Sequence, residues 1–184
     1  MVLAGWDFIG WAFEGPSAWP RRAAVVVLAF CGLVVSLQLA FFQYRLVPSV
    51  WEPWFGDGSV RVLDSAFSRS LPVRDAAVGA AAYLAELVLE LSGGVTRWRR
   101  RPWLVLLLGL LAAAMAVAAL GLVALQAFAI MAFCTLCLVS AAISLSVPLF
   151  VVDEVAATWR QVRRGRRYGL SWVRAVRGGD VDAH

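Results

Sequence analysis

Long uncharged apolar segments alternate with shorter charged ones along this chain. The first apolar segment covers residues 23–42 and contains no charged residue. After a polar stretch at 43–71, a second apolar segment follows at 72–91, and no charge occurs between Pro102 and Asp153. A membrane-spanning helix needs about 20 apolar residues, so the last segment is long enough for two helices. The pattern predicts four membrane helices, at about residues 23–42, 72–91, 103–122 and 127–151.

The helix predicted at 72–91 is the least regular of the four because it carries charges. Asp75 near its start suits the positive end of the helix dipole, and Glu90 suits the membrane interface at the other end. Glu86 lies about one turn deeper, where a carboxylate needs either a polar partner or a proton. Two interpretations of Glu86 stay open: a group that handles protons in a reaction, and a paired or interfacial charge.

The composition excludes two broad classes of protein. The chain is 61% hydrophobic and 16% charged, whereas soluble domains are roughly 45–50% apolar and about 25% charged. A disordered chain would need low hydrophobicity and high net charge. We therefore expect an all-α integral membrane protein with a four-helix membrane domain at 23–152. An N-terminal segment at 1–22 and an arginine-rich tail at 153–184 would flank it.

All 17 basic residues are arginines, and their positions predict the topology. Thirteen lie in residues 1–22, 93–102 and 153–184, whereas four lie between residues 43 and 74. Arginine-rich loops stay in the cytoplasm, so we expect a multi-pass protein of the cell membrane with both termini cytoplasmic and the 43–71 loop outside. Because the arginines flank apolar segments, we attribute the net charge of +5 to topology and expect no nucleic-acid partner. The tail arginines can also contact anionic membrane lipid.

The first 22 residues mix charges, prolines and the tryptophans Trp6, Trp11 and Trp19. Indole rings favour the headgroup level of a membrane, which predicts an interfacial segment. An ordinary tail that packs on the domain is the alternative. The segment lacks the ordered basic start, apolar stretch and cleavage site of a secretory signal.

The clearest candidate for chemistry is the pair Cys134 and Cys137, in the sequence Phe-Cys-Thr-Leu-Cys-Leu. Residues i and i+3 lie on one face of a helix, so the two thiols can close a disulfide with little backbone movement. In a helix that runs inward from about Gln126, the pair lies in the outer half of the membrane. There it can meet a lipid-soluble electron acceptor and a protein disulfide. The alternative is that both cysteines are small buried core residues.

Other uses of cysteine have less support in the sequence. One CxxC supplies two zinc ligands, and the only histidine is the terminal His184, so we expect no metal site. Three cysteines are too few for a disulfide scaffold. Cys31 stands alone in the first predicted helix, and we expect it to fill the core.

Several segments together resemble the vitamin K epoxide reductase family over residues 23–150. Ala-Phe-Cys-Thr-Leu-Cys-Leu around Cys134, on the last predicted helix, is similar to the active-site stretch of that family. Gly-Leu-Val-Val-Ser-Leu at residues 32–37 is similar to the family pattern G-L-x-x-S-L. Further similar positions are Leu71, Pro72, Gly79, Tyr83 and the segment 126–130.

The resemblance implies a four-helix bundle around a quinone site, with the extracytoplasmic loop as its cap. In the family the CxxC pair exchanges electrons with a quinone (menaquinone or ubiquinone), and bacterial members usually oxidise an exported thioredoxin-like partner. By this likeness Cys137 faces the quinone and Cys134 exchanges with the incoming thiol. The candidate quinone-binding residues are Asp75, Gly79, Tyr83, Trp54 and Phe55.

Three departures from the family bear on function. Asp75 stands where some members have an asparagine that hydrogen-bonds the quinone oxygen, and Ala141 stands where vertebrate members have a tyrosine. The external loop has no cysteine, although most members carry a relay pair there, at positions near Trp51 and Ser59. Either a partner's thiol reaches Cys134 directly, or relay cysteines come from another chain, or electron transfer has been lost. Direct exchange needs approach to the sulfur, so the cap would have to open or be shallow.

The external loop is also rich in aromatic residues, namely Trp51, Trp54 and Phe55. One interpretation is a lid over a quinone headgroup, and the other is a loop that its indole rings anchor on the bilayer. We interpret Ser36 and Ser140 as helix-packing residues.

Two functions follow from these observations. The first is a membrane thiol–quinone oxidoreductase that uses Cys134 and Cys137 and supports disulfide formation in an exported thioredoxin-like partner. The second is a non-enzymatic membrane subunit or assembly factor that keeps the bundle and binds quinone. The retained CxxC favours the enzyme, and the cysteine-free loop favours the second function. No predicted helix carries a string of polar residues along one face, which argues against a transporter or channel.

Overall fold

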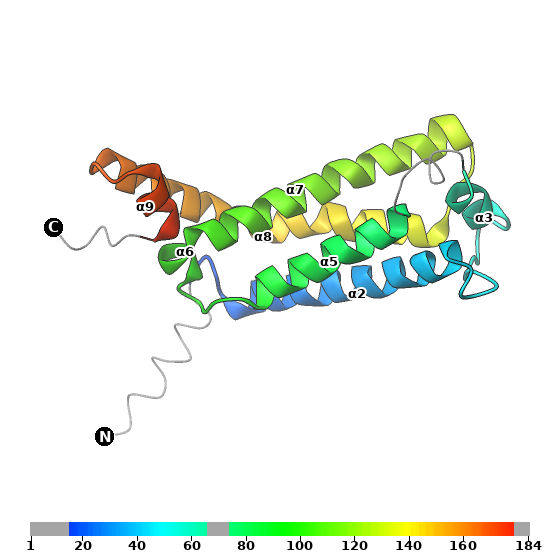
Figure 1. Cartoon of the computed structure of the whole chain (residues 1–184), viewed down its shortest axis with the longest axis horizontal. Coiled ribbons are helices and arrows are strands. Elements are labelled where there is room, and N and C mark those ends of the chain that lie inside the picture. Colours follow the sequence, from blue (N-terminus) through cyan, green and yellow to red (C-terminus); the bar gives the residue numbers. More distant parts are fainter. Residues whose placement is uncertain (1–14, 66–73, 179–184) are drawn as a thin grey trace, which may run out of the picture.

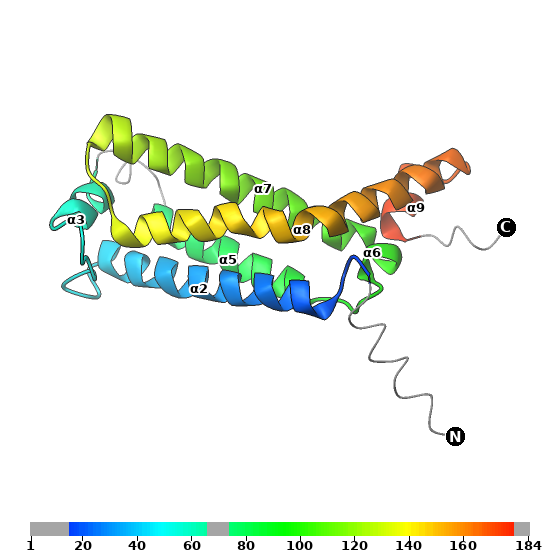
Figure 2. The ribbon, with the colours of Figure 1, turned by 180° about the vertical axis from the view of Figure 1, so that it is seen from behind.

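The computed structural model describes residues 15–65 and 74–178, and the regular structure in these residues is helical. Four long helices lie side by side as a bundle (Figures 1 and 2). They are α2 (Trp19–Gln43), α5 (Asp75–Leu91), α7 (Pro102–Leu125) and α8 (Thr135–Arg167). The shorter elements are α3 (Gly58–Leu63), α6 (Arg97–Arg100), the π-helix η1 (Gln126–Ile130) and α9 (Trp172–Arg177).

Three helical segments in the described part of the chain are long and apolar enough to cross a membrane. They are Trp19–Gln43, Pro102–Ile130 and Thr135–Arg167, with mean hydropathies of 2.6, 2.6 and 2.3. The remaining long helix, α5, has 17 residues and packs along α2. Large apolar side chains such as Phe30, Leu110 and Leu149 lie exposed on the outside of the bundle. The all-α fold is therefore confirmed, and three of the four predicted membrane helices qualify as candidate spans in the described residues.

The first two long helices begin close to their predicted positions but not at them. α2 begins at Trp19, ahead of the predicted residue 23, with Pro20 in its first turn. Proline is tolerated there because the first amides of a helix have no intrahelical partner. α5 begins at Asp75, with the acidic side chain in its first turn. The part of the first 22 residues that holds Trp6 and Trp11 lies outside the described residues.

The turn between the last two long helices lies later than the sequence predicts. We expected it between the helices at 103–122 and 127–151, but α7 continues into η1, and α8 begins only at Thr135. Nothing in the apolar sequence before Gln126 interrupts the helix. It ends at Met131, whose φ of 52° is left-handed, and the next amide, of Ala132, donates to the Gln126 carbonyl at 3.2 Å. The predicted helix start at residue 127 is therefore wrong.

The last long helix also ends later than predicted. α8 runs to Arg167 instead of residue 151, so the first half of the predicted tail is helical and extends beyond the other helices (Figure 1). It stays helical because one side of it remains buried at helical spacing. The buried residues of this extension are Glu154, Thr158, Val162 and Gly165. α9 then folds back against the start of α7 and against α8.

Tyr83 holds three of the long helices together in the middle of the bundle. Its ring lies so close to Gly32 of α2 that any larger residue there would clash. Its hydroxyl group donates to the Ser140 carbonyl at 2.8 Å and hydrogen-bonds the Ser144 hydroxyl at 2.7 Å, both on α8. Ser140 thus contributes to contacts between helices, as we expected. Ser36 of α2 is buried and faces Gly79 of α5.

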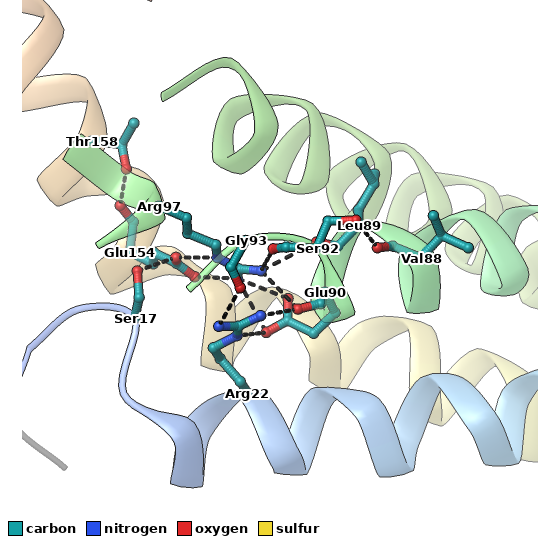
Figure 3. Close-up of polar contacts among 10 residues, drawn as sticks. All are labelled: Ser17, Arg22, Val88, Leu89, Glu90, Ser92, Gly93, Arg97, Glu154 and Thr158. Carbon is teal, nitrogen blue, oxygen red and sulfur yellow. Dashed lines mark hydrogen bonds and ion pairs between the residues drawn. The ribbon is translucent and has the colours of Figure 1, made fainter. Parts of the chain in front are cut away.

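A buried network of charges joins the helices at the other end of the bundle from α3 (Figures 1 and 3). Arg97 of α6 donates from Nε and Nη2 to the two carboxylate oxygens of Glu154 on α8, both at 2.7 Å. Its Nη2 also lies 3.0 Å from Glu90 Oε2 on α5, and Arg22 Nε of α2 lies 3.4 Å from Glu90 Oε1. Ser17 donates a hydrogen bond to Glu154. The sequence interpretation had placed Glu90 at the membrane interface, but it is buried between two arginines.

Glu86 differs from Glu90, which follows it by one helical turn. Both carboxylates are almost completely buried. Among the described residues, neither carboxylate oxygen of Glu86 has a hydrogen-bond partner. Glu86 is thus a polar group in the bundle interior. The described residues offer its carboxylate no hydrogen-bond partner, so they do not support the interpretation as a paired charge.

Candidate redox site

Cys134 and Cys137 lie at the beginning of α8, at the α3 end of the bundle. Cys134 precedes the helix in an extended conformation and is its N-cap residue. Its Sγ accepts a hydrogen bond from the amide of Cys137 at 3.2 Å. The expectation that both residues share a face within the helix is therefore wrong for Cys134. The two residues still lie one turn apart, and both thiols are free in the structure.

The position at the helix start affects the chemistry of Cys134. A hydrogen bond with the Cys137 thiol lowers the pKa of Cys134, burial opposes this, and the nearby Ser59 hydroxyl group and the Cys137 amide lower it further. The net result is a Cys134 pKa below the ordinary value. Helix N-termini favour thiolates because their free amides and dipole stabilise negative charge. Cys134 is thus ionised more easily than an ordinary cysteine.

The two cysteines differ in their exposure. Cys134 is 0% exposed, whereas Cys137 is only partly buried. Residues from α2, α3, α5 and α8 form the apolar cluster around Cys134. This cluster contains Leu39, Ala40, Val62, Leu63, Ala76, Ala132 and Leu136. The site therefore lies where α2 ends and where α5 and α8 begin.

Two polar residues that the sequence analysis did not single out hold this site in place. The side chain of Gln126 is buried, and its Oε1 accepts the amide of Cys134 at 3.0 Å. Glu52 accepts hydrogen bonds from the amide of Thr135, at 3.0 Å, and from its hydroxyl group. A glutamine in an otherwise apolar segment was a signal that could have indicated Gln126.

Glu52 also binds its own loop. It accepts hydrogen bonds from the hydroxyl group of Ser59 and from the amide of Phe55, the latter at 3.3 Å. Partial burial raises the pKa of Glu52, but the hydrogen bonds from Ser59 and Thr135 outweigh it and bring the pKa below the ordinary value. The carboxylate is thus held in its ionised form at the N-terminus of α8.

The predicted quinone-binding residues do not all lie together. Asp75 lies at the same end of the bundle as the cysteines, accepts a hydrogen bond from Gln43 Nε2 at 2.5 Å and acts electrostatically on Cys137. Gly79 is further along α5 against Ser36, where an added Cβ would lie 3.4 Å from the serine Oγ. Tyr83 is deeper still, and its hydroxyl group is engaged by Ser140 and Ser144.

The two aromatic residues of the loop also differ. Phe55 packs on Phe133, the residue before Cys134, with ring centroids 5.7 Å apart. Trp54 is 71% exposed and contacts Trp51 edge-on at 6.4 Å. Phe55 therefore lies beside the cysteine site, while most of the Trp54 ring faces the surroundings.

We had expected Cys31 to fill the core, but it is exposed on α2. The buried face of α2 includes Val25, Ala29, Gly32 and Ser36, and Cys31 lies beside this face. Among the described residues, no group of three or more metal-binding side chains occurs.

The sequence profile of the vitamin K epoxide reductase family matches residues 23–152. The chain belongs to the vitamin K epoxide reductase family. The match includes most of α2, all of α5 and α7, the first part of α8 and both cysteines of the CxxC pair. The resemblance inferred from the sequence motifs is therefore confirmed. A search of curated proteins finds no match to the chain.

Membership of the family carries two coarse conclusions. The family is generally one of thiol–quinone oxidoreductases whose members are integral membrane helical bundles. The candidate membrane helices agree with a multi-pass membrane protein.

Proposed function

We propose that this protein is a membrane thiol–quinone oxidoreductase that passes electrons from a protein dithiol to a quinone through Cys134 and Cys137. The observation that carries this proposal is that Cys134 caps α8 and binds the amide of Cys137. This geometry keeps the two sulfurs within one turn and favours a thiolate at Cys134. A pair of cysteines used only to fill a core would not need a sulfur at a helix N-cap.

In the proposed reaction the cysteine pair alternates between dithiol and disulfide. A partner thiolate attacks Cys134 of the disulfide form, and Cys137 takes the electron pair of the broken bond. A second partner thiol then releases Cys134, which leaves the partner oxidised and the pair reduced. Closing the Cys134–Cys137 disulfide again releases two electrons and two protons, the number that a quinone takes up when it becomes a quinol.

We propose that a quinone headgroup binds beside Cys137, against the apolar cluster at this end of the bundle. Cys137 is only partly buried, and partly buried apolar residues such as Val35, Phe42 and Ala77 pack against the same cluster. Asp75 supplies a polar group close enough to act on Cys137. A mostly apolar wall with one polar group is typical of small-molecule sites. Menaquinone and ubiquinone are the proposed carriers, with Asp75 and Phe55 as the proposed contacts.

The proposal includes a topology with four spans, α5 being the fourth. The loop that holds Glu52 and α3 lies outside, and both termini lie in the cytoplasm. The distribution of the arginines supports this orientation, because thirteen of the 17 fall on one side. The electron donor is then an exported thioredoxin-like protein or a protein that supplies relay cysteines in trans.

A non-enzymatic membrane subunit or assembly factor is the second candidate. The observation that favours it is the lack of cysteines in residues 43–71, because the usual relay pair is missing from this chain. Such a protein would keep the bundle, and Cys134 and Cys137 would not need to change redox state.

The two functions are distinguished by the redox state of the CxxC pair in the full-length protein in lipid nanodiscs. The protein is reduced, freed of reductant and mixed with menaquinone or ubiquinone. Mass spectrometry of alkylated peptides should then report a Cys134–Cys137 disulfide, together with quinol formed in equal amount. Cys134→Ser and Cys137→Ser should abolish quinol formation, whereas Cys31→Ala should leave it unchanged. Thiols that stay free with either quinone would contradict the enzyme and favour the second candidate.

A further inference from the structure

Glu52 connects the external loop to the beginning of α8, next to the proposed reactive cysteine. Its carboxylate accepts hydrogen bonds from two groups of Thr135, the residue that follows Cys134. The same carboxylate accepts a hydrogen bond from Ser59 in the first turn of α3. One side chain thus binds both the short helix of the loop and the helix that Cys134 caps.

α3 covers Cys134 directly. Gly58, its first residue, lies against the carbonyl oxygen of Phe133 so closely that a Cβ at this position would clash with it. Ser59 is buried and lies close enough to Cys134 to act on its thiol. Val62 and Leu63 of α3 belong to the apolar cluster around Cys134. Within this cluster Cys134 has no exposed surface.

We propose that Glu52 is a positioning residue that holds α3 over Cys134, so that a protein thiol reaches Cys134 only after the contact between Glu52 and Thr135 is released. This inference rests on the proposed function, because it assigns the step that controls access to the same site. In a chain without loop cysteines, such a contact would protect the Cys134 thiol from exchange with thiols other than those of its partner.

The exchange reaction explains why this contact matters. The attacking partner thiolate must approach the Cys134 sulfur so that a new sulfur–sulfur bond forms as the bond to Cys137 breaks. With α3 in place, Val62 and Leu63 pack in the same cluster as Cys134, and Cys134 has no exposed surface that a thiolate could reach. The ionised Glu52 carboxylate also repels an incoming thiolate. Release of Glu52 from α8 removes both obstacles.

Glu52 also affects the ionisation of Cys134 itself. The titratable groups that act on Cys134 are Glu52 from the loop and Cys137 from α8, while Asp75 of α5 acts on Cys137. The negative charge of Glu52 raises the pKa of Cys134, against the larger effect of the hydrogen bond with Cys137. Removing this charge without opening the loop should therefore lower the pKa of Cys134.

Alkylation of Cys134 in the reduced full-length protein tests this inference without quinone or partner. The rate with a water-soluble maleimide is followed by peptide mass spectrometry across a range of pH values. Glu52→Ala removes the hydrogen bonds as well as the charge, and should raise the Cys134 rate about tenfold or more, since charge-assisted hydrogen bonds are lost. Glu52→Gln removes the charge but keeps the size, and should also move the pH midpoint of the reaction downward.

Asp57→Asn is the matched control. Asp57 is an exposed acidic residue of the same loop, and its side chain does not cap α3. Its substitution should leave both the rate and the midpoint unchanged. A change in the midpoint is a result that a merely destabilising substitution does not produce. If Glu52→Ala unfolds the protein, Glu52→Gln decides the question.

An unchanged rate and an unchanged midpoint in Glu52→Gln would overturn the inference. So would an effect of equal size in Asp57→Asn. The proposed function fails separately, if the wild-type protein does not form the Cys134–Cys137 disulfide with quinone. In that case a faster alkylation of the Glu52 variants would still support the positioning role of Glu52.

Discussion

The sulfur of Cys134 caps the helix that contains Cys137 and accepts the Cys137 amide at 3.2 Å. The same sulfur atom therefore caps α8 and, in the proposed function, forms the disulfide. Serine is a preferred N-cap residue, and alanine is not. Cys134→Ser and Cys134→Ala therefore distinguish the capping role from the redox role.

We expect Cys134→Ser to keep the stability of the protein and Cys134→Ala to lower it by about 1 kcal/mol, because alanine removes the cap of α8. Both variants should lose quinol formation completely. Thermal unfolding in detergent measures the first effect, and absorbance of the quinone measures the second. Equal stability of the two variants would contradict the capping role of Cys134.

The two buried carboxylates of α5 should respond to substitution in opposite directions. Glu90→Leu leaves Arg22 and Arg97 without their shared partner and should lower stability by about 3–5 kcal/mol. Glu86→Leu removes a carboxyl group that has no hydrogen-bond partner within the described residues, and should raise stability by about 1–3 kcal/mol. Unfolding of both variants under the same conditions is the measurement, and each serves as the control of the other. A loss of stability in Glu86→Leu would indicate a partner of Glu86 beyond the described residues.

Tyr83→Phe distinguishes helix packing from quinone binding. The hydroxyl group of Tyr83 hydrogen-bonds Ser140 and Ser144, so its removal should cost about 0.6 kcal/mol, typical of hydrogen bonds between membrane helices. The KM for quinone should stay unchanged. A large increase of KM at unchanged stability would return Tyr83 to the quinone site.

The contacts of Glu52 should weaken in acid. Its pKa in the folded protein is below the ordinary value, so their contribution is fully present above that ordinary value. It is lost as the pH falls through the lowered pKa, because the protonated carboxyl group accepts hydrogen bonds less strongly. Hydrogen exchange of the α3 amides should therefore become faster at low pH in the wild-type protein, after correction for the intrinsic rate. The same exchange should depend less on pH in Glu52→Gln.

The proposed topology predicts different labelling of two exposed positions in intact cells. Asp57→Cys in the external loop should react with an impermeant thiol reagent, whereas Tyr168→Cys after α8 should react only after lysis. Both are made in a protein that carries Cys31→Ser. Protection of position 57 in intact cells would reverse the orientation.

The helical fold and the family followed from the sequence because they depend on features that lie close together in the chain. Uncharged segments long enough to span a bilayer predicted α2, α7 and α8, since the cost of an unsatisfied backbone in lipid leaves helices as the solution. The short motif around Cys134 identified the family, which the profile match confirms. The turn before α8 was misplaced because the apolar sequence from 103 to 133 carries no charge that would mark its end.

The sequence by itself determined the hydrophobic segments, the spacing of Cys134 and Cys137, and the family, all of which depend on local order along the chain. Only the tertiary structure revealed that Glu52 binds both Ser59 and Thr135. Thr135 is 83 residues away from Glu52 along the chain. The tertiary structure likewise showed that Arg97 binds Glu154, 57 residues away, and that the side chain of Cys31 is exposed. Such pairings depend on how helices dock against each other, and each residue alone looks like an ordinary loop or interfacial residue. A buried charge needs a partner, but the sequence does not say which distant residue the fold will bring to it.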